Sequence, residues 1–344
     1  MVLRMMNLST DGVIVVKCST DTIAQAVREY AGVTRKRAIG EIIRSLRLDD
    51  PDVTVSFGDD AALIKNGDDG LLLAADGIWS RLLEADPHWA GFCSVLVNVH
   101  DIAAMGGKPI AMVDILSIAN EEVCHEVLRG MFEASKKFGV PVVGGHLHPD
   151  AEMNVIDVAI LGTVRPEHAI FSHTAREGDR VVAAIDLEGR VHPSCDLNWD
   201  SATLRSAGEV RAQIHVMRII GEEHLATAGK DISNPGVIGT LGMLLETSAK
   251  GALISPDRIP RPGLKALGIP FEHWIRMYPG MGFILTVPEE HVGKVIRLFG
   301  EVGMTAADIG VVDGSRKLKV AYAGMETVVF DLEKEGIMRI FNEK

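Results

Sequence analysis

Two adjacent carboxylates, Asp59 and Asp60, lie between two apolar runs in the segment VTVSFGDDAALIK. Val53, Val55 and Phe57 alternate as in a half-buried strand, and AALI follows the pair directly. Adjacent like charges beside a core raise each other's pKa unless a cation compensates them. The pair therefore predicts either a metal-binding site or a turn in which Asp59 bonds to its own backbone.

Three further aspartates lie where buried elements are expected. Asp76 ends the apolar segment LLLAADGI, Asp101 lies in the apolar helical segment GFCSVLVNVHDIAAMGG, and Asp231 precedes ISNPG and a helical run. A buried Asp needs a partner or an ion. Asp76 is equally suited to start a turn, and Asp231 to cap a helix in competition with Ser233 or Asn234.

The predicted helix around Asp101 carries a polar stripe. Ser94, Asn98 and Asp101 are spaced i, i+4 and i+7, so they share one helix face. The stripe either faces solvent or lines a site. It lacks the Lys and Glu residues that a solvated face normally carries, which favours a site.

The strand segment VVGGH ends in two glycines, Gly144 and Gly145, which allow a ligand to approach the backbone closely. His146 and His148 alternate on one strand face. Two histidines can bind a transition metal only if a third ligand lies nearby, so a metallohydrolase centred on them is an alternative hypothesis.

Together, several aspartates at element ends and a Gly-Gly turn favour a polyphosphate held by Mg²⁺. Magnesium takes one or two carboxylates and completes its shell with phosphate oxygens and water. The sequence contains neither G-x-x-x-x-G-K-[ST] nor G-x-G-x-x-G, so P-loop and Rossmann sites are excluded.

The chain has 344 residues, of which 47% are apolar and 24% charged, and this predicts a globular protein of two domains. A net charge of −12 argues against partners such as nucleic acid or anionic membrane. The four cysteines form no C-x-x-C pair, and the first residues lack the pattern of a signal peptide. No apolar run reaches membrane-spanning length, so we expect a cytoplasmic protein.

Strand and helix patterns alternate along both halves, which predicts an α+β or α/β class. We expect a helical arm over residues 1–50, a first domain over 51–166 and a second over 167–344. Within them, Asn120 is expected to cap a helix, and 201–223 to form a long helical region.

The segments GDDAALI, AADGI, NVHDIAAMGGKPIAMVDIL, VVGGH, REGDRVVA and DISNPG resemble, in this order, the aminoimidazole ribonucleotide (AIR) synthetase-like superfamily. This superfamily includes thiamine-monophosphate kinase, selenophosphate synthetase and a hydrogenase maturation factor. Within it, the chain is most similar to AIR-synthetase-related proteins called methanogenesis marker protein 2.

The resemblance implies a two-domain fold in which the N-terminal domain forms a dimeric β-barrel with a second subunit and the C-terminal α/β domain closes over ATP. It implies ATP and Mg²⁺ as cofactors. It also implies phosphoryl transfer to, or phosphorylation-based activation of, a small-molecule or protein-bound acceptor in an archaeal (methanogen) biosynthetic or maturation pathway. Asp59, Asp60, Asp76, Asp101 and Asp231 are the implied metal ligands. The implied ATP-binding residues are Asp59, Asp60, Asn98, Gly144, Gly145 and His146.

The chain departs from members of the superfamily at four places, the first being His146, where thiamine-monophosphate kinases carry an Asp after the Gly-Gly pair. Lys17-Cys18 is reversed and lacks the glycines of the selenophosphate synthetase loop, and the chain ends in RIFNEK without a cysteine tail. Asn234 replaces the second aspartate of the DISDG motif. These departures motivate an alternative hypothesis, a low-turnover ATP-binding assembly or maturation factor, in which Cys195 is a candidate thiol carrier.

Overall fold

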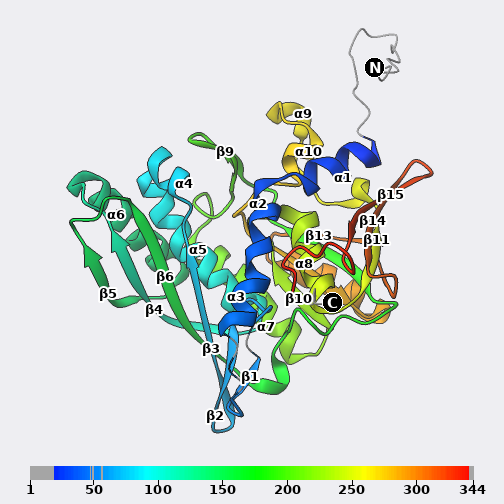
Figure 1. Cartoon of the computed structure of the whole chain (residues 1–344), viewed down its shortest axis with the longest axis horizontal. Coiled ribbons are helices and arrows are strands. Elements are labelled where there is room, and N and C mark those ends of the chain that lie inside the picture. Colours follow the sequence, from blue (N-terminus) through cyan, green and yellow to red (C-terminus); the bar gives the residue numbers. More distant parts are fainter. Residues whose placement is uncertain (1–18, 47, 49, 56, 341–344) are drawn as a thin grey trace.

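The computed structural model describes residues 19–46, 48, 50–55 and 57–340. The N-terminal half is built on a six-stranded sheet (Figure 1), antiparallel except for its β4–β5 pair. Its strands, in spatial order, are β1 (Val53–Val55), β2 (Ala62–Asn66), β3 (Asp69–Gly77), β6 (Val155–Val164), β4 (Lys108–Ser117) and β5 (Val142–His148). Alternation along β6 buries Ile156, Val158 and Ile160 on one face, because successive side chains of a strand point to opposite sides.

Helices cover that buried face. They are α4 (Ser80–Ala85), α5 (Pro87–Ala104) and α6 (Glu121–Phe138). Asn120 caps α6 as predicted, since its Oδ1 accepts a bond from the Val123 amide (3.0 Å). Gly91 and Gly130 let α5 and α6 approach closely: a Cβ on Gly130 would lie 1.9 Å from the His88 carbonyl oxygen. This contact fixes α5, the helix that carries Asp101.

The opposite face of the six-stranded sheet is open in this protomer. Leu73 pairs with Leu161, Val113 with Ala159, and Ile115 with Asp157, so these residues share the open face. Leu73, Val113 and Ile115 are 47%, 45% and 49% exposed, which is unusual for apolar strand residues. The sheet does not close into a barrel within one chain; the predicted dimeric barrel requires a second copy.

The C-terminal half is built on a seven-stranded sheet. Its order is β10 (Ala228–Asp231), β12 (Gly282–Val287), β7 (Arg180–Ile185), β13 (Thr305–Asp313), β11 (Gly251–Ile254), β14 (Lys317–Tyr322) and β15 (Met325–Asp331). A separate hairpin joins β8 (Arg190–His192) to β9 (Cys195–Asp200). The mixed α/β class predicted from the strand and helix alternation is confirmed.

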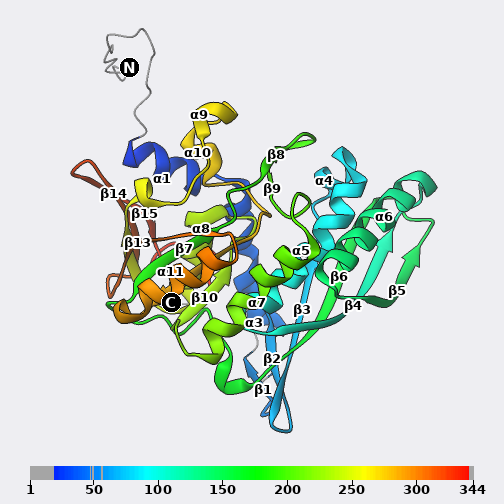
Figure 2. The same cartoon turned by 180° about the vertical axis from the view of Figure 1, so that it is seen from behind.

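Helices lie on both faces of this sheet (Figure 2), with α8 (Gly236–Thr247) on one side and α7 (Ala207–Glu222) and α11 (Val292–Glu301) on the other. The remaining short helices are η2 (Pro166–His168), η3 (Pro256–Arg258), α9 (Leu264–Leu267), α10 (Phe271–Trp274) and η4 (Glu289–His291). The helical region expected from residue 201 begins only at Ala207. Ser206 and Glu209 form a capping box there, which sets the helix start.

The described part of the predicted arm is helical and consists of α1 (Thr20–Arg28), α2 (Ala31–Thr34), η1 (Arg35–Ala38) and α3 (Ile39–Leu46), while the limits of the arm stay a prediction. Figure 1 shows it in dark blue, with α1 beside β15 of the C-terminal half. The Thr327 hydroxyl of β15 donates to the Asp21 carboxylate (2.7 Å), and the Gly40 amide donates to the Met338 carbonyl (2.8 Å). The arm is therefore fixed to the far half of the chain.

One hydrophobic core runs through both halves. Phe92 of α5 belongs to the same buried cluster as Phe283 of β12 and Phe299 of α11. The predicted boundary at residue 166 falls between the last strand of the first sheet and the first strand of the second; the exact domain limits stay a prediction. Among the described residues, no helix combines the length and apolar character needed to cross a membrane.

Candidate active site

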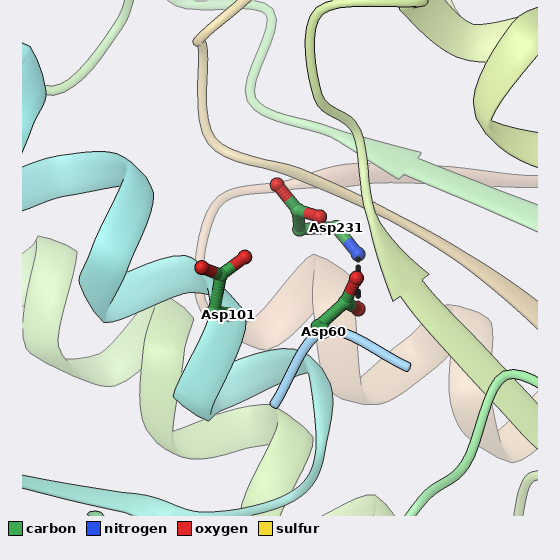
Figure 3. Close-up of side chains that lie close together, drawn as sticks. All are labelled: Asp60, Asp101 and Asp231. Carbon is green, nitrogen blue, oxygen red and sulfur yellow. Dashed lines mark hydrogen bonds between the residues drawn. The ribbon is translucent and has the colours of Figure 1, made fainter. Parts of the chain in front are cut away.

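Three aspartates from distant parts of the chain converge between the two halves. Carboxylate oxygens of Asp60, Asp101 and Asp231 all lie within 4.8 Å of one another. Figure 3 shows the three side chains facing a common space between α5, the loop that carries Asp60, and β10. We call these three residues the aspartate triad.

Local structure explains each position. Asp60 follows Gly58, whose φ of +106° turns the chain after β1 in a way that side chains disfavour. Asp101 lies in the last turn of α5, and Asp231 is the final residue of β10. The Asp231 amide points at the Asp60 carboxylate (3.4 Å), which links the N-terminal loop to the C-terminal sheet.

A lysine shares the triad. The Lys230 ammonium contacts the Asp60 carboxylate, and both side chains are buried. Burial opposes the charge of Lys230, but the carboxylates of Asp60 and Asp231 raise its pKa above the ordinary value. Three carboxylates thus face one fixed cation.

Burial and repulsion from neighbouring carboxylates raise the pKa of all three triad carboxylates, so Lys230 offsets only part of their combined charge. Burial raises the pKa of Asp101 well above its usual range, and the carboxylates of Asp76, Asp231 and Asp60 raise it further. Burial, together with Asp60, raises the pKa of Asp231 to about 8. Burial also raises the pKa of Asp60, while Lys230 opposes that shift. A bound cation would relieve this repulsion.

The donor set fits magnesium. The triad offers carboxylate oxygens only, which hard divalent cations prefer, and leaves room for phosphate oxygens in a cavity of about 280 Å³. Among the described residues, this is the one group of three or more acidic, His or Cys side chains close enough to share an ion. His146 and His148 lie edge to face, with ring centroids 4.6 Å apart, and gain no third ligand there.

Asp59 reaches the cavity wall but has other partners. Its carboxylate accepts bonds from the Ser172 amide, the Ser172 hydroxyl (2.9 Å) and His173 Nδ1 (2.7 Å). The bond to Asp59 raises the pKa of His173, against the effect of partial burial. Within this structure, Asp59 joins the two halves and does not enter the triad. The alternative turn, with Asp59 bonded to its own backbone, is not what these contacts show.

Asp76 lines the cavity beside the triad, from the end of β3. Desolvation raises its pKa, while Lys36, Lys230 and Arg35 lower it. Asp76 shares the cavity with the triad but is not one of the three converging residues. Its assignment as a ligand stays a prediction.

The structure does not bring the other predicted ATP-binding residues to the triad within one protomer. Asn98 is buried on α5, where its amide donates to the Ser94 carbonyl (2.8 Å), while Cys93, Val97 and Asp101 form the cavity-facing side of the helix. Gly144, Gly145 and His146 lie on the exposed edge strand β5. Their assignments stay predictions.

The cap expected before α8 is not formed. Pro235 occupies the N-cap without a side-chain bond, and the Asn234 amide instead donates to the Tyr278 hydroxyl (3.1 Å). The Asp231 side chain is therefore not used as the helix cap and can form part of the triad. Cys195 lies half-buried in β9 with a free thiol, and burial raises its pKa. Lys17 and Cys18 lie outside the described residues.

Sequence reasoning missed Lys230, Arg35, Lys36 and Tyr278, all of which line the cavity. Lys230 carries a usable signal, since a lysine directly after the small residues ATAG needs an acidic partner if the strand is buried. Arg35 and Lys36 carry none, because only the packing of the arm on the second half brings them to the site.

Comparison with known proteins agrees with this architecture. The model of the AIR synthase related protein N-terminal domain matches residues 58–164, and that of the C-terminal domain matches 176–323. An uncharacterized protein of Methanocaldococcus jannaschii is 47% identical over 92% of this chain and 98% of its own length. An uncharacterized protein of Synechocystis is 35% identical over 92% of this chain and 96% of its own length. A selenide, water dikinase of Carboxydothermus hydrogenoformans is 21% identical over 87% and 93%.

Solved structures share the fold. T. maritima PurL complexed with ADP superposes with a TM-score of 0.73 at 19% identity, over 92% of this chain and 52% of PurL. The chain thus spans about half the length of PurL. AaThiL complexed with AMPPCP and TMP gives a TM-score of 0.63 at 20% identity, over 84% of this chain and 95% of AaThiL. With both family domains matched over most of its length, this chain belongs to the AIR synthase-related family.

Proposed function

We propose that the protein binds Mg²⁺ and ATP at the aspartate triad and transfers a phosphoryl group to an acceptor. The observation that carries the proposal is the convergence of Asp60, Asp101 and Asp231, contributed by both halves, into one cavity. The fold shared with PurL and AaThiL, which have been solved with ADP and AMPPCP, supports a nucleotide as the ligand.

In this proposal the triad holds Mg²⁺, with Asp76 as a further candidate ligand. When bound, the ion would supply positive charge that offsets the triphosphate and the negative charge developing on the departing ADP. Lys230 adds one fixed positive charge beside Asp60. Burial of the triad keeps the surroundings low in dielectric, which strengthens each of these interactions.

Phosphoryl transfer then proceeds by direct displacement. The bond between the γ-phosphorus and the bridging oxygen breaks, a bond forms to the nucleophilic atom of the acceptor, and ADP leaves. The proton of the acceptor is released. The protein contributes mainly positioning and charge, so no dedicated nucleophilic side chain is required.

The test is calorimetric titration with ATP in the presence of Mg²⁺. Asp101→Asn removes a triad charge with almost no change in shape, and we expect it to weaken Mg-ATP binding by about tenfold or more. Asp257→Asn is the matched control, since Asp257 is exposed on η3 and lies outside the cavity. Equal affinities of Asp101→Asn and wild type would reject the assignment.

We also propose a homodimer that buries the open face of the six-stranded sheet. The exposed apolar side chains on β3, β6 and β4 support it. Gly144 and His146 pair with Val113 and Ile115 and so lie on the same face. In this arrangement they would approach a nucleotide only across the interface between subunits.

The acceptor pathway was expected in methanogenic archaea. The relative in Methanocaldococcus jannaschii supports an archaeal role, but the relative in Synechocystis argues for an acceptor that occurs beyond archaea as well. We therefore propose a biosynthetic or maturation step that is not confined to methanogenesis.

A second candidate is a nucleotide-dependent assembly factor with little turnover. Two observations favour it: Asn234 bonds to Tyr278 in place of presenting a carboxylate, and Lys230 already neutralises part of the triad. Tight ATP binding without measurable ADP formation would support this candidate. Multiple turnovers with a free small molecule would reject it.

A further inference from the structure

A second concave region lies away from the triad, at the seam between the two halves. There α7 of the C-terminal half packs against α5 and α6 of the N-terminal half (Figure 2). Two adjoining cavities of about 220 and 350 Å³ share Lys108 and Arg218 in their walls. None of the described residues lines both this region and the triad cavity. We call the smaller cavity, which is lined by Lys108 and one face of α7, the seam pocket.

The rim of the seam pocket is positively charged. Arg211, His215 and Arg218 are spaced i, i+4 and i+7, so they share one face of α7. Lys108 joins them from the start of β4, and no carboxylate among the described residues lines this pocket. The whole chain has 47 acidic and 35 basic residues, so two arginines and a lysine without an acid run against its composition. Such a concentration of one charge attracts an anion.

Two of these cations keep donors that the folded protein does not use. Lys108 is exposed and forms no ion pair among the described residues. Arg218 donates from Nε to the Glu222 carboxylate (2.7 Å), and its two Nη groups have no partner among the described residues. An oxyanion can therefore accept bonds from both side chains without breaking a contact of the fold.

The third cation, Arg211, is held rigidly. Its Nε and Nη2 groups donate to the carbonyls of Lys137 (3.0 Å) and Lys136 (2.6 Å) at the end of α6. The guanidinium lies against Gly139, where a Cβ would be only 2.8 Å from Cζ. Arg211 thus adds a fixed positive charge to the pocket wall. Its replacement would also disturb α6, so it is a poor choice for a test.

The floor of the seam pocket is apolar. Val99 of α5, Phe138 at the end of α6, Val140 and Ile214 of α7 all line it and are buried. Low-dielectric surroundings strengthen a charge-assisted hydrogen bond at the rim. A short apolar portion of a ligand would gain free energy by leaving water for this floor.

The number of cations indicates the charge of the ligand. Two arginines and a lysine favour a group with two negative charges over a group with one. A phosphate monoester carries a charge of about −1.5 to −2 at pH 7, whereas a carboxylate carries a single charge. Arginine also matches the oxygen geometry of phosphate with paired N–H donors.

We propose that the seam pocket binds a small organic molecule that carries a phosphate monoester and a short apolar portion. Lys108 and Arg218 hold the phosphate, and the floor around Phe138 and Val140 packs on the apolar portion. The ligand contacts both halves, because Lys108 belongs to the first sheet and Arg218 to α7. This site is separate from the triad and does not depend on the proposed phosphoryl transfer.

The experiment uses the full-length protein in EDTA, so that no divalent ion holds phosphate at the triad. Butyl phosphate is titrated by ligand-observed NMR, with butyrate as the singly charged and butanol as the uncharged counterpart. Lys108→Gln/Arg218→Gln is compared with wild type and with Lys265→Gln/Arg297→Gln. This last variant is a matched control: both of its positions are exposed and outside the cavities, and Arg297, like Arg218, pairs with a glutamate four residues further on.

We expect wild type and the matched control to bind butyl phosphate more tightly than butyrate, and butanol least. Lys108→Gln/Arg218→Gln should bind butyl phosphate about tenfold more weakly, because charge-assisted hydrogen bonds are lost. Butyl phosphate should raise the melting temperature of wild type more than that of this variant, since a ligand that binds only the folded protein stabilises it. Arg35→Gln/Lys36→Gln, which changes the triad cavity instead, should bind the probe as wild type does.

Four results would overturn the inference. Wild type that does not bind butyl phosphate, or Lys108→Gln/Arg218→Gln that binds it with unchanged affinity, would show that the seam pocket is not the site. Equal binding of butyrate and butyl phosphate would reject the phosphate. A loss of affinity confined to Arg35→Gln/Lys36→Gln would place the probe in the triad cavity.

Discussion

The Lys230 ammonium contacts the Asp60 carboxylate inside the protein, and the two side chains are only 5% and 4% exposed. This pair joins a β10 residue to a loop 170 positions earlier in the chain. It also places a permanent cation within the triad, so a metal bound as proposed would share the Asp60 carboxylate with Lys230.

Replacing Lys230 with Met should therefore destabilise the metal-free protein. Removing one partner of a buried ion pair leaves an uncompensated charge and typically costs about 3–5 kcal/mol. We expect this loss in urea unfolding with EDTA, and partial recovery with Mg²⁺. The control is Lys294→Met, whose pair with Glu223 is about 40% exposed on both sides and is worth at most about 1 kcal/mol. Equal losses in the two variants would contradict the role given to Lys230.

The bond between His173 and Asp59 predicts a pH dependence of stability. The pKa of His173 is raised in the folded protein, so its contribution is fully present below the unfolded value of about 6.5 and is lost as the pH rises through the folded value. In EDTA, wild type should lose this part of its thermal stability between slightly acidic and mildly alkaline pH, and His173→Gln should not. His125→Gln, an exposed position on α6, should follow wild type.

The open sheet face predicts an effect on oligomeric state. Val113→Lys places a charge in the proposed interface and should give a monomer in analytical ultracentrifugation, because burying an unpaired charge is costly. Phe132→Lys is the control: Phe132 is 65% exposed, but it lies on α6. If Val113→Lys and wild type sediment alike, the face is not the dimer contact.

The surroundings of Gly130 and Gly300 predict opposite effects when each is replaced by alanine. Gly130→Ala forces the helices apart and should destabilise the protein by about 1–3 kcal/mol in denaturant unfolding. Gly300→Ala on α11 meets no neighbour within 4 Å and should stabilise it by about 0.4–1 kcal/mol. Gly130→Ala should also weaken Mg-ATP binding, because Asp101 moves with α5. If Gly130→Ala unfolds at the same denaturant concentration as wild type, the contact between α5 and α6 accommodates the added methyl group at little cost.

The sequence drew attention to five aspartates, because buried aspartates are costly and therefore conspicuous in an apolar context. Three of the five converge in the structure, and their assignment as metal ligands stays a prediction. The prediction grouped Asp59 with Asp60, because adjacency in sequence does not show where each side chain points. The partners that hold the Asp59 carboxylate away from the triad, Ser172 and His173, lie more than 110 residues further along the chain. The start of α7 was missed although its capping box is visible in the letters SAGE.

Long-range packing accounts for what remained hidden. No local pattern indicates that η1 lies beside the triad, because its position follows from Gly32 and Gly40 fitting against the C-terminal half. Likewise, the spacing of Asn98 and Asp101 predicted one shared face, but the helix turns Cys93 and Val97 toward the cavity along with Asp101.

The division of the triad between the two halves also bears on how the protein is made. Asp60 and Asp101 leave the ribosome well before Asp231, so a nascent chain holds only part of the site. The proposed nucleotide binding would then wait until synthesis has passed β10 and the second sheet has docked. One fragment that ends near residue 166 and a second that starts there should each fail to bind Mg-ATP when expressed separately. The mixture of the two should bind Mg-ATP.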